Sequence, residues 1–162
     1  MEKDKIVFRT EVKPEDLRAI RDIVTSTHFF YDFEIPVAVE LAEARLIEGD
    51  ASGYFFIFVE VDGKTVAYSC FGPVAMTEGG FDLFWIVTHN DYRALGLGKI
   101  LLEKTHQSVK EMGGRYLVAE TSAMEKYAPT RHFYEKNEYS KEAEIADFYK
   151  IGDGKVIFVK RL

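Results

Sequence analysis

The sequence is poor in cysteine, and this limits both its structure and its chemistry. Among 162 residues only Cys70 is a cysteine, so no internal disulfide can form. Cys70 lies in the apolar run 66–71, where a buried and unreactive thiol is expected. None of the 4 histidines has a histidine or cysteine three or four residues away, the spacing that places two metal ligands on one helix face. We therefore expect no metal site.

Long apolar segments are also missing. Residues 1–5 are mostly charged, unlike a signal peptide. The longest apolar run, residues 54–59, is much too short to span a bilayer. We expect a protein of the reducing cytoplasm with no membrane partner.

Positive charge is in the minority. The chain has 21 Lys and Arg residues against 27 Asp and Glu residues, which gives a net charge of −6. Because nucleic-acid binding usually requires a basic face, we expect no nucleic-acid partner. An apolar fraction of 47% is typical of a globular protein. No repeat, linker or low-complexity tract divides the chain, which predicts a single domain over residues 1–162.

Hydrophobic periodicity and turn residues predict an α/β (α+β) layered domain. Asp62-Gly63 between two apolar runs is a strong hairpin signal, because both turn positions favour a positive φ. A strand, a helix and a second strand between residues 81 and 120 predict a crossover between parallel strands. We expect about seven strands in a mixed, mostly antiparallel sheet, flanked by about four helices. The expected strands are 5–12, 54–61, 64–71, 81–88, 115–120, 139–149 and 155–160, and the expected helices start near residue 14 and cover 36–47, 98–112 and 129–136.

The most informative local segment lies between the expected strand 81–88 and the helix that follows it. Its glycines let the backbone approach a ligand closely. The first amides of a helix lack internal partners and sit at the positive end of its dipole, so they form an anion site. The two basic residues of the segment add charge for phosphate groups. The segment reads Arg93-Ala94-Leu95-Gly96-Leu97-Gly98-Lys99.

Two common phosphate motifs do not fit this segment. A P-loop requires a glycine where Arg93 stands and a Ser or Thr where Ile100 stands. A dinucleotide fingerprint requires a third glycine where Leu101 stands. An isolated Gly-x-Gly is weak evidence for a phosphate site. Its simpler interpretation is a turn that only lets helix and strand pack closely.

In its context the segment resembles a known motif. The pattern Arg-x-x-Gly-x-Gly, after a strand that ends in Trp85, Ile86 and Val87, resembles the acetyl-CoA-binding motif of the GNAT N-acetyltransferase superfamily. Residues 133–136, Phe-Tyr-Glu-Lys, resemble a second family segment, Phe-Tyr-Glu-Lys-x-Gly-Phe. The expected element order also matches the family over nearly the whole chain. Segments 82–85, 120–122, 147–149 and 152–153 resemble a bacterial and archaeal subgroup without a settled substrate.

The chain departs from the family pattern at two places. Asn137 and Glu138 precede Tyr139 where the family has a glycine followed by an aromatic residue, and Asn137 can still take a left-handed C-cap. Tyr127 stands where the family often has an asparagine that contacts pantetheine.

The resemblance implies transfer of an acetyl group from acetyl-CoA to a primary amine by direct attack in a ternary complex. It implies that the backbone of residues 85–87 pairs with the pantetheine arm and that the amides of 93–99 hold the pyrophosphate. It makes Tyr134 the candidate acid for the leaving sulfur. Without the resemblance, a core tyrosine would be the plainer interpretation of Tyr134.

The reaction also needs a base, because an ammonium has no lone pair and a lysine amine has a pKa of ~10.4. Glu120 ends the strand that follows the crossover, where ligands usually bind in such sheets, and we favour it slightly as base or amine anchor. Asp82 is the other candidate, on the substrate side, where some family members carry a glutamate. For Glu120 and Asp82 alike, a purely structural role, at a solvated strand end or in an ion pair, is as good an interpretation as a catalytic one.

The acceptor stays open at this stage. We expect a small-molecule or peptide amine as the acceptor. It can be a free amino acid, a polyamine, an aminoglycoside, a protein N-terminus or a lysine side chain. A longer acyl-CoA donor and a non-catalytic CoA-binding module are alternatives on the same fold. An exposed late strand is compatible with a homodimer.

Overall fold

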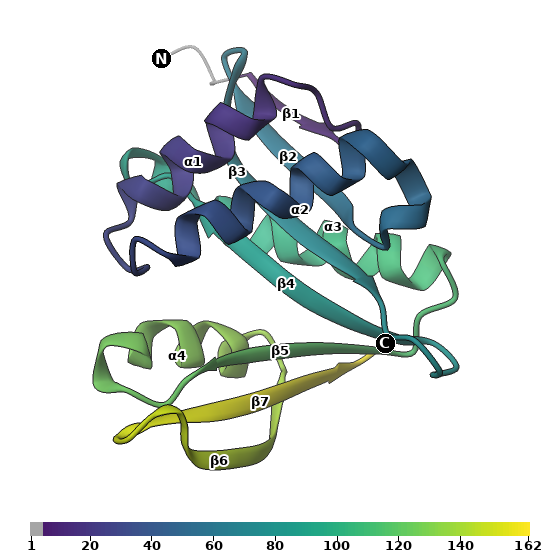
Figure 1. Cartoon of the computed structure of the whole chain (residues 1–162). Coiled ribbons are helices and arrows are strands. Elements are labelled where there is room, and N and C mark those ends of the chain that lie inside the picture. The colour runs from purple at the N-terminus through teal and green to yellow at the C-terminus, as the bar shows by residue number, and fades with distance from the viewer. Residues whose placement is uncertain (1–4) are drawn as a thin grey trace. The chain divides into compact units, whose positions relative to one another are not determined.

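The computed structural model describes residues 5–162 and confirms the expected element order (Figure 1). A seven-stranded sheet has the strand order β1-β2-β3-β4-β5-β7-β6. The strands are β1 (Ile6–Arg9), β2 (Phe55–Val61), β3 (Lys64–Pro73), β4 (Gly80–Thr88), β5 (Tyr116–Ser122), β6 (Ser140–Lys150) and β7 (Asp153–Arg161). The α-helices of the described part are α1 (Asp16–Ser26), α2 (Glu34–Glu48), α3 (Leu97–Glu111) and α4 (Ala128–Lys136). The predicted fold class is therefore confirmed.

The contacts divide the chain into two compact units. The first contains the residues up to Gly72 together with Trp85–Thr105, and the second contains Pro73–Phe84 and His106–Leu162. Both β4 and α3 contribute residues to each unit. The expectation of a single domain over residues 1–162 stays a prediction.

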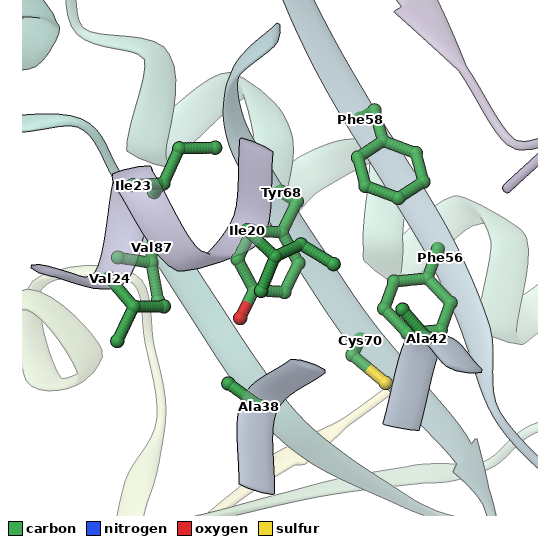
Figure 2. Packing of buried hydrophobic residues seen from close by; sticks show 10 residues of the cluster. All are labelled: Ile20, Ile23, Val24, Ala38, Ala42, Phe56, Phe58, Tyr68, Cys70 and Val87. Carbon is green, nitrogen blue, oxygen red and sulfur yellow. The ribbon is translucent and has the colours of Figure 1, made fainter. Parts of the chain in front are cut away.

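In the first unit, α1 and α2 cover one face of the strands β2–β4 (Figure 1). Because side chains alternate along β3, Tyr68 and Cys70 point into the core beneath these helices, while Ser69 points the other way and contacts Thr105 of α3 through hydroxyl groups 2.8 Å apart. Cys70 is buried, as predicted, and burial raises the pKa of its thiol. Figure 2 shows the core residues Ile20, Ile23, Val24, Ala38, Ala42, Phe56, Phe58, Tyr68, Cys70 and Val87.

A charged cluster fixes β1 to α1. Two nitrogens of Arg9, Nη1 and Nη2, each lie 2.8 Å from an oxygen of the Asp16 carboxylate, and Nε donates to Glu60 at 2.8 Å. Asp16 is only 1% exposed, and its hydrogen bond raises the pKa of the Arg9 guanidinium. A cavity of about 420 Å³ borders the cluster. Since Arg9 and Asp16 satisfy one another, we interpret this cluster as structural.

The hairpin and the crossover are both confirmed. Asp62 and Gly63 have φ values of 50° and 82° and connect the antiparallel strands β2 and β3. In the second unit, β4 pairs in parallel with β5 over four residues, beginning at Gly80 opposite Tyr116. On its other side β5 pairs with β7 in antiparallel orientation. The parallel pairing requires the long connection that α3 supplies.

Two local predictions are wrong. The first strand ends at Arg9 rather than near residue 12, because Asp16 accepts a hydrogen bond from the Lys13 amide at 2.7 Å and turns the chain into α1. Asn137 does not take the left-handed conformation, since its φ is −97° and Glu138 takes φ 67° instead. The Asn137 side chain donates to the Phe133 carbonyl at 2.7 Å, which satisfies the end of α4 in another way.

Within residues 5–162, no helix combines the length and the apolar character that crossing a membrane would require.

Candidate functional site

The proposed phosphate segment joins the end of β4 to the start of α3 in the first unit. A short 3₁₀ helix (Asn90–Leu95) follows β4 and ends at Gly96, whose φ of 68° and ψ of 21° lie in the left-handed region. This conformation favours glycine, because a Cβ atom is strained there. The buried Leu97 then anchors the start of α3. The unpaired amides of the first turn of α3 therefore follow directly on a sharp turn, which suits an anion.

The basic residues of this segment are exposed. Arg93 and Lys99 both lie on the surface, where a phosphate group can reach them. The guanidinium of Arg93 lies 5.7 Å from the centre of the Phe29 ring, and the Asn90 amide donates to Ser26 Oγ at 3.0 Å. These contacts hold the segment against the C-terminal end of α1. Ala94, Leu95 and Gly96 are exposed beside them, and Gly98 is partly buried.

The last residues of β4 lack a partner in β5. The β4–β5 ladder covers only Gly80–Leu83, although β4 continues to Thr88. On that edge of β4, the backbone N–H and C=O groups of Trp85, Ile86 and Val87 therefore have no hydrogen-bond partner in the β4–β5 ladder. An extended ligand with amide groups would satisfy them.

The two candidate bases share one electrostatic environment in the second unit. The carboxylate of Glu120 lies 2.6 Å from the Lys155 ammonium. Asp82 is half-buried, and burial followed by the charge of Glu120 raises the pKa of its carboxyl, while Lys155 lowers it. The Lys155 ammonium also lies 4.0 Å from the centre of the Phe148 ring. No local pattern in the sequence marks Lys155, because only the pairing of β5 with β7 brings it to Glu120.

Tyr134 is packed into the second unit from α4. It is 6% exposed, and its ring centre lies 5.6 Å from that of Phe158 and 5.1 Å from that of Tyr139. Burial raises the pKa of its phenol, so the hydroxyl keeps its proton at neutral pH. The helix is held to the end of β5 by Arg131, whose Nη1 donates to the carbonyl oxygens of Ser122 and Met124, each at 2.8 Å.

The candidate acid and the candidate bases approach β5 and β7 from opposite faces. Tyr134 packs on Phe158, which lies directly opposite Ala119 in the β5–β7 register. The next residue, Glu120, therefore points to the other face. Asp82 is paired with the residue two positions before Glu120, so it shares the face of Glu120. The structure thus brings the two carboxylates together and separates both from the phenol by the sheet.

The part of the chain that the structure describes, residues 5–162, contains no group of three or more His, Cys, Asp or Glu side chains that could hold a metal ion.

Comparison with known proteins identifies the family. The model of the acetyltransferase (GNAT) family matches residues 17–139. The chain belongs to this family. A crystal structure from Desulfovibrio desulfuricans that is assigned to the GNAT family has 43% identity and a TM-score of 0.95, and the match covers 97% of this chain and 99% of that one. No curated protein sequence matches the chain.

More distant structures share the fold. The ribosomal-protein-S18-alanine N-acetyltransferase from Escherichia coli has 20% identity and a TM-score of 0.76, with 97% of this chain and 94% of that chain covered. An aminoglycoside 6′-N-acetyltransferase complexed with coenzyme A has 15% identity and a TM-score of 0.75, with 97% and 96% covered. At these identities the likeness concerns the fold alone. The family supports acetyl-CoA as the co-substrate.

Proposed function

We propose that the protein is an N-acetyltransferase that moves the acetyl group of acetyl-CoA to a primary amine by direct attack in a ternary complex. The observation that supports this best is the left-handed turn at Gly96, which presents the first amides of α3 directly after β4, as an anionic coenzyme requires. In the aminolysis of a thioester the amine loses a proton and the departing thiolate gains one. A tyrosine hydroxyl can supply the second proton and a carboxylate can accept the first.

The residues of the first unit fit coenzyme A. The amides that open α3 and the side chains of Arg93 and Lys99 suit the pyrophosphate. The unpaired edge of Trp85–Val87 suits the amide groups of the pantetheine arm, and one of its amides polarises the thioester carbonyl. Tyr127, at the N-cap of α4, stands where the family often has an asparagine that contacts pantetheine, so we assign no pantetheine contact to this position.

Tyr134 supplies the acid. Its hydroxyl donates its proton to the leaving sulfur, and the raised pKa of the buried phenol keeps that proton in place until the thiolate forms. A deprotonated phenol could not act in this way. The phenol is therefore in its protonated form throughout the neutral pH range.

The two carboxylates have different roles toward the amine. Glu120 anchors the amine through its partly exposed carboxylate, which already accepts one ammonium, that of Lys155, at 2.6 Å. Asp82 accepts the proton, directly or through a water, because its raised pKa brings it closer to neutral pH than an ordinary aspartate. Glu120 stays the alternative base until the two are separated by experiment.

An acceptor screen tests the function. The protein and acetyl-CoA are mixed with free amino acids, polyamines, aminoglycosides, and peptides with a free N-terminus or an internal lysine, and released CoA thiol is measured. Two structural neighbours are named for ribosomal-protein alanine and for aminoglycosides, so both classes belong in the panel. We expect at least one amine to accelerate thiol release. No release with any amine, together with no melting shift by acetyl-CoA or longer acyl-CoAs, would overturn the proposal.

Asp82→Asn and Glu120→Gln then separate the two carboxylates. The base variant should lose about tenfold or more in kcat/KM and its acidic pH limb. The anchor variant should mainly raise KM for the amine. Glu142→Gln, which affects an exposed carboxylate paired with Arg161, is the matched control and should leave both constants unchanged.

A further inference from the structure

A second tyrosine, Tyr139, lies against Tyr134 and is held by a histidine. The hydroxyl of Tyr139 lies 2.7 Å from His106 Nε2. The ring centres of Tyr139 and Tyr134 are 5.1 Å apart, at an angle of 59° between the ring planes. The Tyr139 amide also donates to the Tyr134 carbonyl oxygen at 3.0 Å. All three residues lie in the second unit.

Burial makes this hydrogen bond costly to break. Tyr139 is 5% exposed, so its hydroxyl would find little water if the bond to His106 were lost. A buried polar group without a partner carries a substantial free-energy penalty. Burial also raises the pKa of Tyr139, so its hydroxyl remains a donor. The bond therefore fixes the Tyr139 ring in one position.

The charge state of His106 agrees with this arrangement. Burial, followed by the charges of Lys160 on β7 and Lys110 on α3, lowers the pKa of His106 to about 4. The imidazole is therefore neutral at the pH of any ordinary assay, and its Nε2 can accept the proton of the Tyr139 hydroxyl. The hydrogen bond persists across the range in which the enzyme works and does not act as a pH switch.

Other aromatic rings contact the ring of Tyr134 on more than one side. Phe158 is fully buried and lies 5.6 Å from it, and the neighbouring Phe133 lies at 5.6 Å in an edge contact. Tyr139 completes this enclosure. If Tyr139 moved, the Tyr134 ring would gain freedom on that side, and its hydroxyl would no longer be held at one point. Proton donation to a sulfur depends steeply on that position.

We propose that His106 and Tyr139 are positioning residues that orient the phenol of Tyr134 for proton donation, with His106 acting through its hydrogen bond to Tyr139. The inference rests on the proposed acid role of Tyr134. Neither residue touches the substrate in this assignment. Their effect should therefore fall on kcat and leave the KM for acetyl-CoA unchanged, because the groups that fit the pyrophosphate belong to other segments.

Kinetic variants test this inference. Tyr139→Phe removes only the hydroxyl, and His106→Phe removes the acceptor while keeping a ring. Each should lower kcat about fivefold, and the double variant should lose no more than either single variant, because both break the same bond. His106→Gln retains a hydrogen-bonding group and should recover most of the loss. His132→Gln, at an exposed position on α4, is the control and should behave as wild type.

The background of Tyr134→Phe separates positioning from general stability. In that background His106→Phe should cause no further loss of kcat, because the group it orients is gone. Equal losses in both backgrounds, or an unchanged kcat in Tyr139→Phe and His106→Phe, would overturn the inference. If Tyr134→Phe itself has no effect, the acid assignment fails instead. Thiol release from acetyl-CoA is measured with the fastest amine of the panel, or with water as the acceptor.

A spectroscopic measurement needs no acceptor and no turnover. In protein labelled with [ζ-¹³C]tyrosine, the Tyr134 resonance is identified by its loss in Tyr134→Phe. We expect this resonance to shift or broaden in His106→Phe and to return in His106→Gln. A Tyr134 resonance that is identical in wild type and His106→Phe would overturn the inference.

Discussion

The ammonium of Lys155 on β7 lies 2.6 Å from the carboxylate of Glu120 on β5. The side chain of Lys155 is 14% exposed and that of Glu120 is 44% exposed, so the lysine contributes the buried member of the pair. The two residues belong to adjacent antiparallel strands and point to the same face. A fixed positive charge thus lies next to both candidate bases.

Lys155→Met should change the pH dependence of the reaction. Lys155 lowers the pKa of Asp82, so its removal should raise that pKa. A base with a raised pKa is protonated at higher pH, so the acidic limb of kcat/KM should move to higher pH. The pH–rate profile checks this. Lys141→Met, which breaks an exposed pair with Glu144, is the control, and a limb at the same pH in both variants would contradict the prediction.

Tyr134→Phe should lower kcat about tenfold or more while leaving acetyl-CoA affinity unchanged. Only the hydroxyl is removed, and the ring keeps its contacts with Phe158 and Tyr139. Steady-state kinetics and calorimetric binding of acetyl-CoA measure the two quantities. An undiminished kcat would refute the acid role.

Gly96→Ala should weaken coenzyme A binding. The φ of 68° places an alanine in the left-handed region, at a cost of about 1 kcal/mol in the free energy of unfolding. Relaxation of this strain would shift the start of α3 and raise the Kd for coenzyme A about tenfold. Gly53→Ala is a matched control, because Gly53 has a φ of 76° and equally open space. Both variants should lose stability, and equal Kd values in calorimetry would argue against the pyrophosphate assignment.

Arg9→Met should destabilise the protein by about 3 kcal/mol, because it leaves the carboxylate of Asp16 buried without its ion pair. Chemical denaturation measures the free energy of unfolding. Arg161→Met is the comparison, since it breaks an exposed pair with Glu142 and should leave the unfolding midpoint unchanged. Similar losses in both variants would show that burial does not decide the strength of the Arg9 pair.

Short-range patterns made much of this fold predictable. The turn at Asp62-Gly63 depends on the conformation of two residues, and the sequence predicted it directly. The first strand was predicted too long, because the turn that ends it depends on the side chain of Asp16. Asn137 was misjudged for a similar reason, since its side chain bonds to Phe133 and Glu138 takes the left-handed conformation.

By itself the sequence determined the order of the elements, because periodicity and turn chemistry act over a few residues. It made residues 93–99 a candidate phosphate segment and, largely through the family resemblance, made Tyr134, Glu120 and Asp82 the candidate acid and bases. Only the tertiary structure decided that Lys155 meets Glu120, that His106 meets Tyr139, and that the candidate acid and the candidate bases lie on opposite faces. Strand register and helix packing set these relations, and both depend on contacts between residues far apart in the chain.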